Sequence, residues 1–266
     1  MELKEAIGRR RTIRFYLPFR PVERAKIQKM LEAARRASCA GNVMNVRAIV
    51  IWRDQASPEL LKAITPGIGY QQMQTAPVFI LWCSEASVYH GANWIESVLR
   101  LAENRRIGLE VESTQAEINT KLRPVFVRTG EQMGVAPMTF ADVGQAIAQA
   151  TLVAYEEGLG TCLMGGGTLA AAAKLMNLPA TCHPVLLQSV GYPAESWEAG
   201  GQTPKTPFGE MFFEMSHGQS FVEDPAVEKE LWDAKLIQEQ APLPWRDAEL
   251  RYVAGALGLK DTLLND

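Results

Sequence analysis

The chain has 266 residues, of which 47% are hydrophobic and 21% are charged. This composition is typical of a folded protein and excludes disorder over most of the chain. Lysine and arginine total 27 against 30 for aspartate and glutamate, which gives a net charge of -3. Such a surface has no overall attraction for phosphate backbones or anionic bilayers, which argues against general binding to nucleic acids or membranes.

The apolar runs and the cysteines predict the compartment. The longest runs, residues 48–52 and 78–83, are too short to cross a bilayer, and charged residues follow Met1 directly. We therefore expect neither a membrane span nor a secretory signal. The cysteines are Cys39, Cys83, Cys162 and Cys182. Because they are scattered and lack the spacing of zinc ligands, we expect free thiols, no metal and a cytoplasmic location.

The first half of the chain alternates helical and apolar patterns. We expect helices at residues 3–10 and 22–37, a turn at 38–42 and buried strands at 48–52 and 78–83. The second helix has the clearest signal, because its apolar residues recur at i, i+3, i+4 and i+7 from Ile27. Residues 91–137 are polar and favour helix without clear boundaries.

The second half has a sharper pattern. Thr139 is expected to cap a long helix that ends at Gly158, and this helix is rich in small residues, so another helix could pack closely against it. We then expect a strand at 161–164, a glycine loop at 165–167, a helix at 168–177, a strand at 183–190 and a helix after Pro225. Strands that alternate with helices predict an α/β layered domain.

The basic residues 9–14 form the first candidate site. Arginine forks and the hydroxyl of Thr12 suit a phosphate group. A solvated helix end would give the same pattern, and a DNA-binding arm is a further alternative that the pI near 5.8 disfavours.

Three other segments could approach a ligand. The small residues at 38–42 would let a ligand near the backbone, although an ordinary helix end has the same spacing. The glycines at 165–167 could present backbone N–H groups, but they match neither a Rossmann nor a P-loop pattern, and a plain strand-to-helix turn is the alternative. Lys205 lies between prolines and could equally be a surface lysine.

The common catalytic motifs are missing from the sequence. It contains no Gly-x-Ser-x-Gly and no His-Glu-x-x-His, and its three histidines lie in unrelated contexts. We therefore predict no catalytic side chain and chemistry borrowed from a cofactor.

Taken in order, these segments resemble the nitroreductase family of FMN-dependent flavoproteins. The matching stretches are residues 5–16 with 21–23, residues 37–42 with Arg47 and the strand to Ile51, residues 141–146 with 158–166, and residues 190–193 with 204–207. The sequence departs from the usual family pattern in two places. Met44 and Asn45 stand where Gln-Pro is frequent, and Lys205 stands where an arginine is frequent and offers a point charge instead of a fork.

The resemblance implies a three-layer α/β fold (α+β in some schemes) with a central mixed sheet flanked by helices. It implies one domain over residues 1–266, with an excursion at 84–138 that could cover the substrate and an extended segment at 216–266. It also implies a homodimer with FMN at the interface. The implied FMN-binding residues are Arg10, Arg11, Thr12, Arg14, Ser38, Cys39, Asn42, Met164, Gly165, Gly166 and Lys205.

The function implied by the resemblance is an FMN-dependent oxidoreductase. Hydride would pass from NADH or NADPH through flavin N5 to a small acceptor, such as a nitroaromatic or a quinone, in a ping-pong mechanism. Alternatives on the same fold are reductive dehalogenation, flavin-consuming chemistry and a flavin-binding protein without turnover. The excursion at 84–138 is expected to decide the choice of acceptor.

Overall fold

The structure is a computed structural model that describes residues 2–67, 70–165 and 169–259. The elements of the first half are α1 (Leu3–Arg9), α2 (Arg24–Arg35), the short helix η1 (Ala40–Asn42), β1 (Val46–Trp52), α3 (Pro58–Ile64), α4 (Tyr70–Thr75), β2 (Val78–Glu85), η2 (Ala86–Tyr89), α5 (Asn93–Glu103), α6 (Val111–Glu117), the π-helix η3 (Ile118–Leu122) and α7 (Arg123–Gly134). Those of the second half are α8 (Pro137–Glu156), β3 (Gly160–Met164), α9 (Leu169–Leu175), β4 (Cys182–Gly191), α10 (Phe208–Met211), α11 (Pro225–Asp233) and α12 (Arg246–Leu257).

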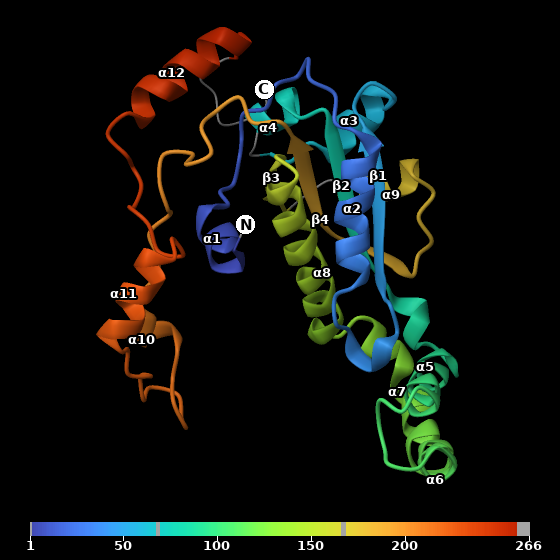
Figure 1. Ribbon diagram of the computed structural model, residues 1–266. Helices are drawn as coiled ribbons and strands as arrows, with labels where there is room; N and C mark the ends of the chain where they lie inside the picture. Colours follow the sequence, from blue (N-terminus) through green and yellow to red (C-terminus); the bar gives the residue numbers. More distant parts are fainter. Residues whose placement is uncertain (1, 68–69, 166–168, 260–266) are drawn as a thin grey trace.

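The four strands form one antiparallel sheet in the order β1-β2-β4-β3 (Figure 1). This corrects the expectation of a mixed sheet: in the described chain, parallel pairing is restricted to isolated bridges such as Thr12 with Thr161. The reason lies in the connections. After β1 the chain passes through α3 and α4 and returns as β2, which runs antiparallel to β1. Alternating helices and strands therefore do not form a βαβ unit here, because that unit needs parallel strands.

Helices cover both faces of the sheet, which confirms the expected three layers (Figure 1). All eight residues of β2 are buried, as a continuous apolar run predicts. Because side chains alternate along a strand, Val78, Ile80 and Trp82 pack with α2 and α8 on one face. Phe79 and Leu81 pack on the other face, with α3, α4 and α9.

The long helix α8 begins earlier than the sequence predicts. Pro137 occupies the first turn, and the preceding residue is Ala136, which has no polar side chain to cap the helix. Thr139 lies inside the helix and is fully buried, and its hydroxyl donates to the Ala136 carbonyl at 2.8 Å. The prediction of Thr139 as the cap is therefore wrong. Proline fits the first turn of a helix because its fixed φ is helical and its missing N–H needs no partner.

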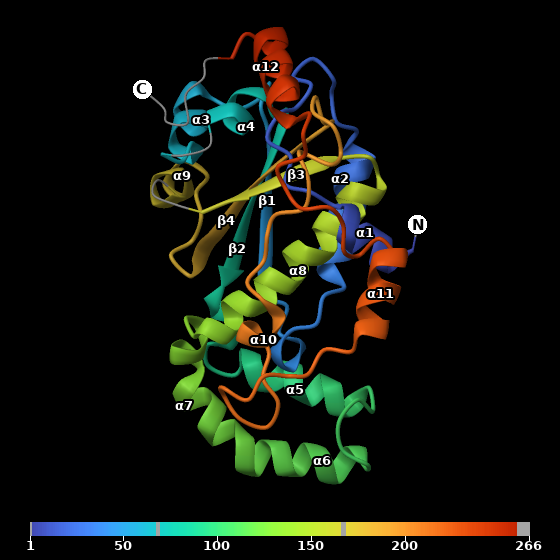
Figure 2. The ribbon, with the colours of Figure 1, turned by 90° about the vertical axis from the view of Figure 1, so that its left-hand side faces the viewer.

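The helices α5 to α7 form an arm beyond the end of the sheet (Figures 1 and 2). Trp94 is buried in this arm and stacks on Phe126, with ring centroids 3.9 Å apart and planes inclined by 20°. Its ring also meets the edge of Tyr89 at 5.5 Å. The arm therefore has an apolar cluster of its own, which contains Trp94.

The C-terminal elements α10 to α12 lie beside the layered body, past α1 and the end of α8 (Figures 1 and 2). The helix expected after Pro225 is present as α11, and the Asp224 side chain caps it by accepting from the Ala226 N–H at 2.8 Å. Throughout the described residues, each helix is too short or too polar for a bilayer span.

Candidate functional site

The basic segment after α1 lies along the free edge of β3. The Ile13 N–H donates to the Thr161 carbonyl at 3.0 Å, and Thr12 forms a parallel bridge with Thr161. Ile13 is fully buried, and a Cβ on Gly160 would lie 2.7 Å from its side chain, so the segment approaches the strand closely. This contact fixes residues 10–14 at the start of β3.

Two arginines of this segment have guanidinium groups without protein partners. Within the described residues, the guanidinium groups of Arg10 and Arg14 make no hydrogen bond or ion pair. Arg10 is half-buried, and burial lowers the pKa of its guanidinium from 12.5, although an arginine stays charged at neutral pH. A partly desolvated cation without a counter-charge favours an anion beside it. Arg14 is exposed and adds a second positive charge.

The resemblance implies that Arg10 and Arg11 both bind FMN. In the structure, however, the side chain of Arg11 points into the protein. Its guanidinium donates to the carbonyls of Gly8, Arg10 and Gly201 and to the Gln238 side chain, the last at 3.0 Å. These bonds occupy four of the five N–H groups that a guanidinium has. Burial, followed by the charge of Arg10, lowers the pKa of Arg11.

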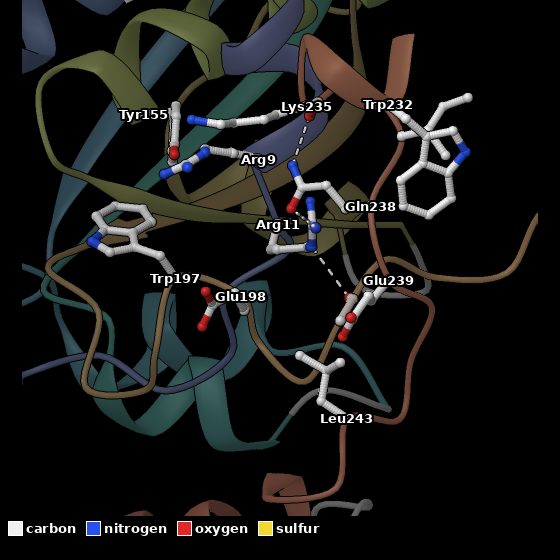
Figure 3. Close-up of a pocket in the computed structure, with 12 residues that line it drawn as sticks. Arg9, Arg11, Tyr155, Trp197, Glu198, Trp232, Lys235, Gln238, Glu239 and Leu243 are labelled. Carbon is white, nitrogen blue, oxygen red and sulfur yellow. Dashed lines mark hydrogen bonds between the residues drawn. The ribbon is translucent and has the colours of Figure 1, made fainter. Parts of the chain in front are cut away.

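Arg11 also lines a hollow of about 400 Å³ between α8 and the C-terminal segment (Figure 3). The other cations at this hollow, Arg9 and Lys235, already pair with Glu5, at 3.0 Å and 3.5 Å. These three cations therefore have protein partners, unlike the guanidinium groups of Arg10 and Arg14.

The predicted loop at residues 38–42 lies near the other end of α8. The Ala40 N–H donates to the buried carboxylate of Asp142 at 3.1 Å, and the Ser97 hydroxyl donates to the Gly41 carbonyl. Gly41 and Asn42 have φ of 57° and 56°, a left-handed turn that glycine and asparagine tolerate. Hydrogen bonds from two helices therefore hold this loop.

Ser38 and Cys39 face a hollow of about 340 Å³ between α2 and β1. Burial raises the pKa of the Cys39 thiol, which accepts from the Met44 N–H at 3.4 Å. A raised pKa keeps this thiol protonated and a poor nucleophile at neutral pH.

The predicted flavin residues therefore fall into two groups within one chain. Residues 38–42 are fixed at Asp142, in the second turn of α8, whereas residues 10–14 are fixed at Thr161, after the helix has ended. At 1.5 Å per residue, the part of α8 between the two groups spans roughly 20 Å. One chain alone does not bring the two groups together.

The remaining predicted residues lie near β3 or in the following connection. Met164 is buried at the end of β3, and the nearest atom to a Cβ on Gly165 would be 3.9 Å away, so the backbone there is approachable. Gly166 lies outside the described residues. Lys205 is exposed, and its amino group has no partner in the part of the chain that the structure describes.

Sequence reasoning missed Gln72 of α4. Its Nε2 donates to Cys162 Sγ of β3 at 3.6 Å, and its Oε1 is buried without a hydrogen-bond partner among the described residues. A buried unpaired oxygen costs roughly 1–3 kcal/mol, which a ligand N–H could offset. The signal in the sequence was a polar residue next to the apolar Met73; in the structure both side chains are buried.

Sequence reasoning also missed Glu195. Its buried carboxylate accepts the backbone N–H groups of Arg14 at 2.6 Å and Phe15 at 3.1 Å. It therefore shapes the basic segment from a position about 180 residues away in the chain. No periodicity or motif in the sequence connects these residues.

Comparisons with known proteins identify the family. The model of the Nitroreductase family matches residues 7–192. A comparison with curated proteins finds no match. Among solved structures, a nitroreductase family protein from Streptococcus pneumoniae is 19% identical with a TM-score of 0.63, covering 80% of this chain and 100% of that one.

Two further structures are similar. A protein from Exiguobacterium sibiricum, solved in complex with FMN, is 21% identical with a TM-score of 0.56, covering 78% of this chain and 94% of that one. A protein from Staphylococcus epidermidis, assigned as an NAD(P)H:FMN oxidoreductase, is 16% identical with a TM-score of 0.62, covering 80% and 96%. At these identities the likeness establishes the fold. With the family match over residues 7–192, the chain belongs to the nitroreductase family of oxidoreductases.

Proposed function

We propose that the protein is a homodimeric, FMN-dependent oxidoreductase that uses NADH or NADPH to reduce a small acceptor, such as a nitroaromatic or a quinone. The similar protein from E. sibiricum binds FMN, and the one from S. epidermidis is assigned as an NAD(P)H:FMN oxidoreductase. These relatives support the cofactor and the electron donor. The contacts of this chain support where the cofactor binds.

The observation that carries the proposal is the pair of unpartnered arginines at the edge of β3. The phosphate of FMN carries a charge of about -1.5 to -2 by analogy with other phosphate monoesters. Arg10, Arg14 and the Thr12 hydroxyl would bind it, with Lys205 as a further cation. Charge-assisted hydrogen bonds contribute roughly 1.5–3 kcal/mol each, so a few of them hold a cofactor without a covalent link.

Arg11 has a different role in this proposal. Because the protein already takes up most of its hydrogen-bonding capacity, Arg11 fixes the backbone of the segment that carries Arg10 and Thr12. It acts behind the phosphate site as a positioning residue.

The flavin ring would lie at the C-terminal end of β3. Gly165 leaves the backbone approachable, Met164 provides apolar cover, and Gln72 offers the unpaired oxygen beside Cys162. These groups fit a flat ring with apolar faces and polar edges.

A second copy of the chain would complete the site. Residues 38–42 lie too far along α8 to reach the Arg10 group of their own chain. In the proposed two-fold arrangement, the loop of one chain would lie beside the arginines of the other. The exposed face of α8 supports such a contact. It presents small or polar residues, and nothing described lies within 4 Å of a Cβ placed on Gly144. Ser38, Cys39 and Asn42 would then reach the flavin from the partner.

When bound, FMN supplies hydride transfer through its N5 between the nicotinamide and the acceptor. The protein's own residues bind and orient the cofactor and keep bulk water from the ring, and we propose that no side chain of the chain is itself catalytic. The arm of α5 to α7 would set which acceptor enters.

The test is the visible spectrum of the purified protein. We expect a yellow protein, or one that turns yellow on adding FMN, whose colour is lost within minutes under argon on adding NADH or NADPH and returns on adding a quinone. A protein that stays yellow with both nicotinamides is a flavin carrier, and one that retains no FMN contradicts the proposal.

A further inference from the structure

The buried carboxylate of Glu195 joins the basic segment to the last helix. The Glu195 side chain is 0% exposed, and its Oε1 accepts the backbone N–H groups of Arg14 and Phe15. Its Oε2 accepts from the Arg246 guanidinium of α12 at 2.6 Å. Both oxygens are therefore satisfied, and Arg246 provides the counter-charge that a buried carboxylate needs.

Several contacts fix the position of the Arg246 side chain. Its side chain is 13% exposed, and its second nitrogen donates to Glu249 at 2.6 Å. Glu249 in turn accepts the Ser196 backbone N–H at 2.6 Å. A Cβ on Gly200 would lie 2.6 Å from Arg246 Cδ, so the absence of a side chain at Gly200 makes room for the arginine. The Arg246 guanidinium thus bonds to two carboxylates. Glu195 in turn holds the backbone of the basic segment, and Glu249 holds the backbone N–H of Ser196.

A second joint holds the basic segment nearer its start, at Arg11. Arg11 donates to the Gly201 carbonyl and to the side chain of Gln238, which lies next to it in Figure 3. The Gln202 N–H donates to the Glu239 carbonyl at 2.9 Å. At the hollow, the C-terminal segment is therefore held to the basic segment by the hydrogen bonds of Arg11.

Both joints use residues outside the part of the chain that matches the family. That match ends at residue 192, whereas Glu195, Gly201, Gln238 and Arg246 all follow it. The shape of the basic segment therefore depends on residues that lie beyond the stretch matched by the family model.

We propose that Arg246 is a positioning residue, through which the C-terminal segment fixes the backbone of Arg14 and Phe15 and sets the affinity of the basic segment for the FMN phosphate. This inference rests on the proposed function. Without Arg246, the Glu195 charge is buried and unpaired, so the carboxylate turns toward water and releases the two N–H groups it holds. The segment then has to be ordered at the moment of binding, which lowers affinity.

The experiment compares Arg246→Met with Arg251→Met in the full chain. Arg251 is an exposed arginine of the same helix whose guanidinium donates to the Asp247 carbonyl of its own helix at 3.3 Å. One readout is hydrogen exchange of the peptide that contains Arg14 and Phe15, which needs no FMN. The other is the Kd for added FMN.

We expect Arg246→Met to exchange faster at Arg14 and Phe15 and to raise the Kd about ten-fold or more, with Arg251→Met within about two-fold of the unmodified protein. Glu195→Gln combined with Arg246→Met should recover most of the affinity, because an amide oxygen still accepts the two N–H groups and needs no counter-charge. A general loss of structure would not be repaired in this way.

Unchanged exchange and an unchanged Kd in a folded Arg246→Met protein would overturn the inference, and so would a double variant as weak as the single one. If Arg246→Met does not fold, Arg246→Gln, which removes the charge but keeps a hydrogen-bond donor for Glu195, is measured by the same criteria. If the unmodified protein binds no FMN, the proposed function fails, while the exchange data still decide whether Arg246 positions the segment.

Discussion

The Ala40 N–H donates to the buried carboxylate of Asp142 at 3.1 Å, which fixes the loop after α2 to the second turn of α8. The contact places Ser38, Cys39 and Asn42 at one end of α8, while the basic segment is fixed beyond the other end. The separation of these two groups is the basis for the proposal that the site is shared between two chains.

Asp142→Ala should lower the free energy of unfolding by about 1–3 kcal/mol, because it leaves the Ala40 N–H without its acceptor. Asp142→Asn keeps an acceptor and should cost less. Urea unfolding of the two variants measures the difference. Glu156→Ala, which removes an exposed carboxylate at the other end of the same helix, should change little. Equal losses in Asp142→Ala and Asp142→Asn would mean that the hydrogen bond does not hold the loop.

Arg10→Met should raise the Kd for FMN about ten-fold to a hundred-fold, since it removes one charge-assisted contact worth roughly 1.5–3 kcal/mol. Methionine keeps the apolar stem of the side chain. Arg9→Met is the matched control, because the neighbouring Arg9 already pairs with Glu5. Titration with FMN measures both. An unchanged Kd in Arg10→Met would remove Arg10 from the phosphate site.

Gly144→Leu tests whether the open face of α8 is the interface between chains. In an isolated chain this change is tolerated, because nothing described lies within 4 Å of the new Cβ and leucine favours helix over glycine. If a second α8 packs there, the side chain separates the copies. We expect a mass near 29.4 kDa in place of twice that value, and loss of bound FMN.

Gly255→Leu in α12 is the control, since it is a helical glycine with the same open surroundings. It should leave the mass and the FMN content unchanged. A Gly144→Leu protein that stays dimeric and yellow would show that this face is not the interface.

Glu85 should make stability depend on acid pH. Burial alone would raise its pKa, but hydrogen bonds from Thr181 and Ser87 outweigh burial, so the pKa lies below its ordinary value of 4.5. A lowered pKa in the folded protein gives stability that is present above pH 4.5 and lost as the pH falls through the folded value. Urea unfolding from pH 6 to about pH 3 should therefore show a smaller acid-side loss for Glu85→Gln than for the unmodified chain. Stability curves that fall in parallel for the two proteins would show that Glu85 is not the source of this pH dependence.

The elements with strong local patterns could be predicted from the sequence. The helix α2 and the strand β2 were predicted because apolar spacing and burial coincide there. The start of α8 is not predicted correctly, because Pro137 in the first turn and Thr139 two residues later are both typical of a helix start. The direction of the strands also escaped prediction, since periodicity does not show which neighbour a strand pairs with.

The sequence predicts candidate members of the site but not how they are arranged. The motif at residues 10–14 identifies basic residues, yet only the structure distinguishes the unpartnered Arg10 from Arg11, whose N–H groups are bound to carbonyls and Gln238. The contact of Glu195 with Arg246 joins residues 51 apart, and no local rule connects them. The distance along α8 between Asn42 and the arginines likewise depends on how the chain folds.

Complementation between two defective chains tests the central claim that each FMN site takes residues from both copies. One chain carries Arg10→Met and the other Asn42→Gly, a change that the left-handed backbone at Asn42 accepts. In the purified heterodimer, one site has both native residues and the other has neither. We predict that each variant homodimer binds FMN weakly and that the heterodimer binds a single FMN per pair of chains with the affinity of the unmodified protein. A heterodimer as weak as the two homodimers would contradict the shared site.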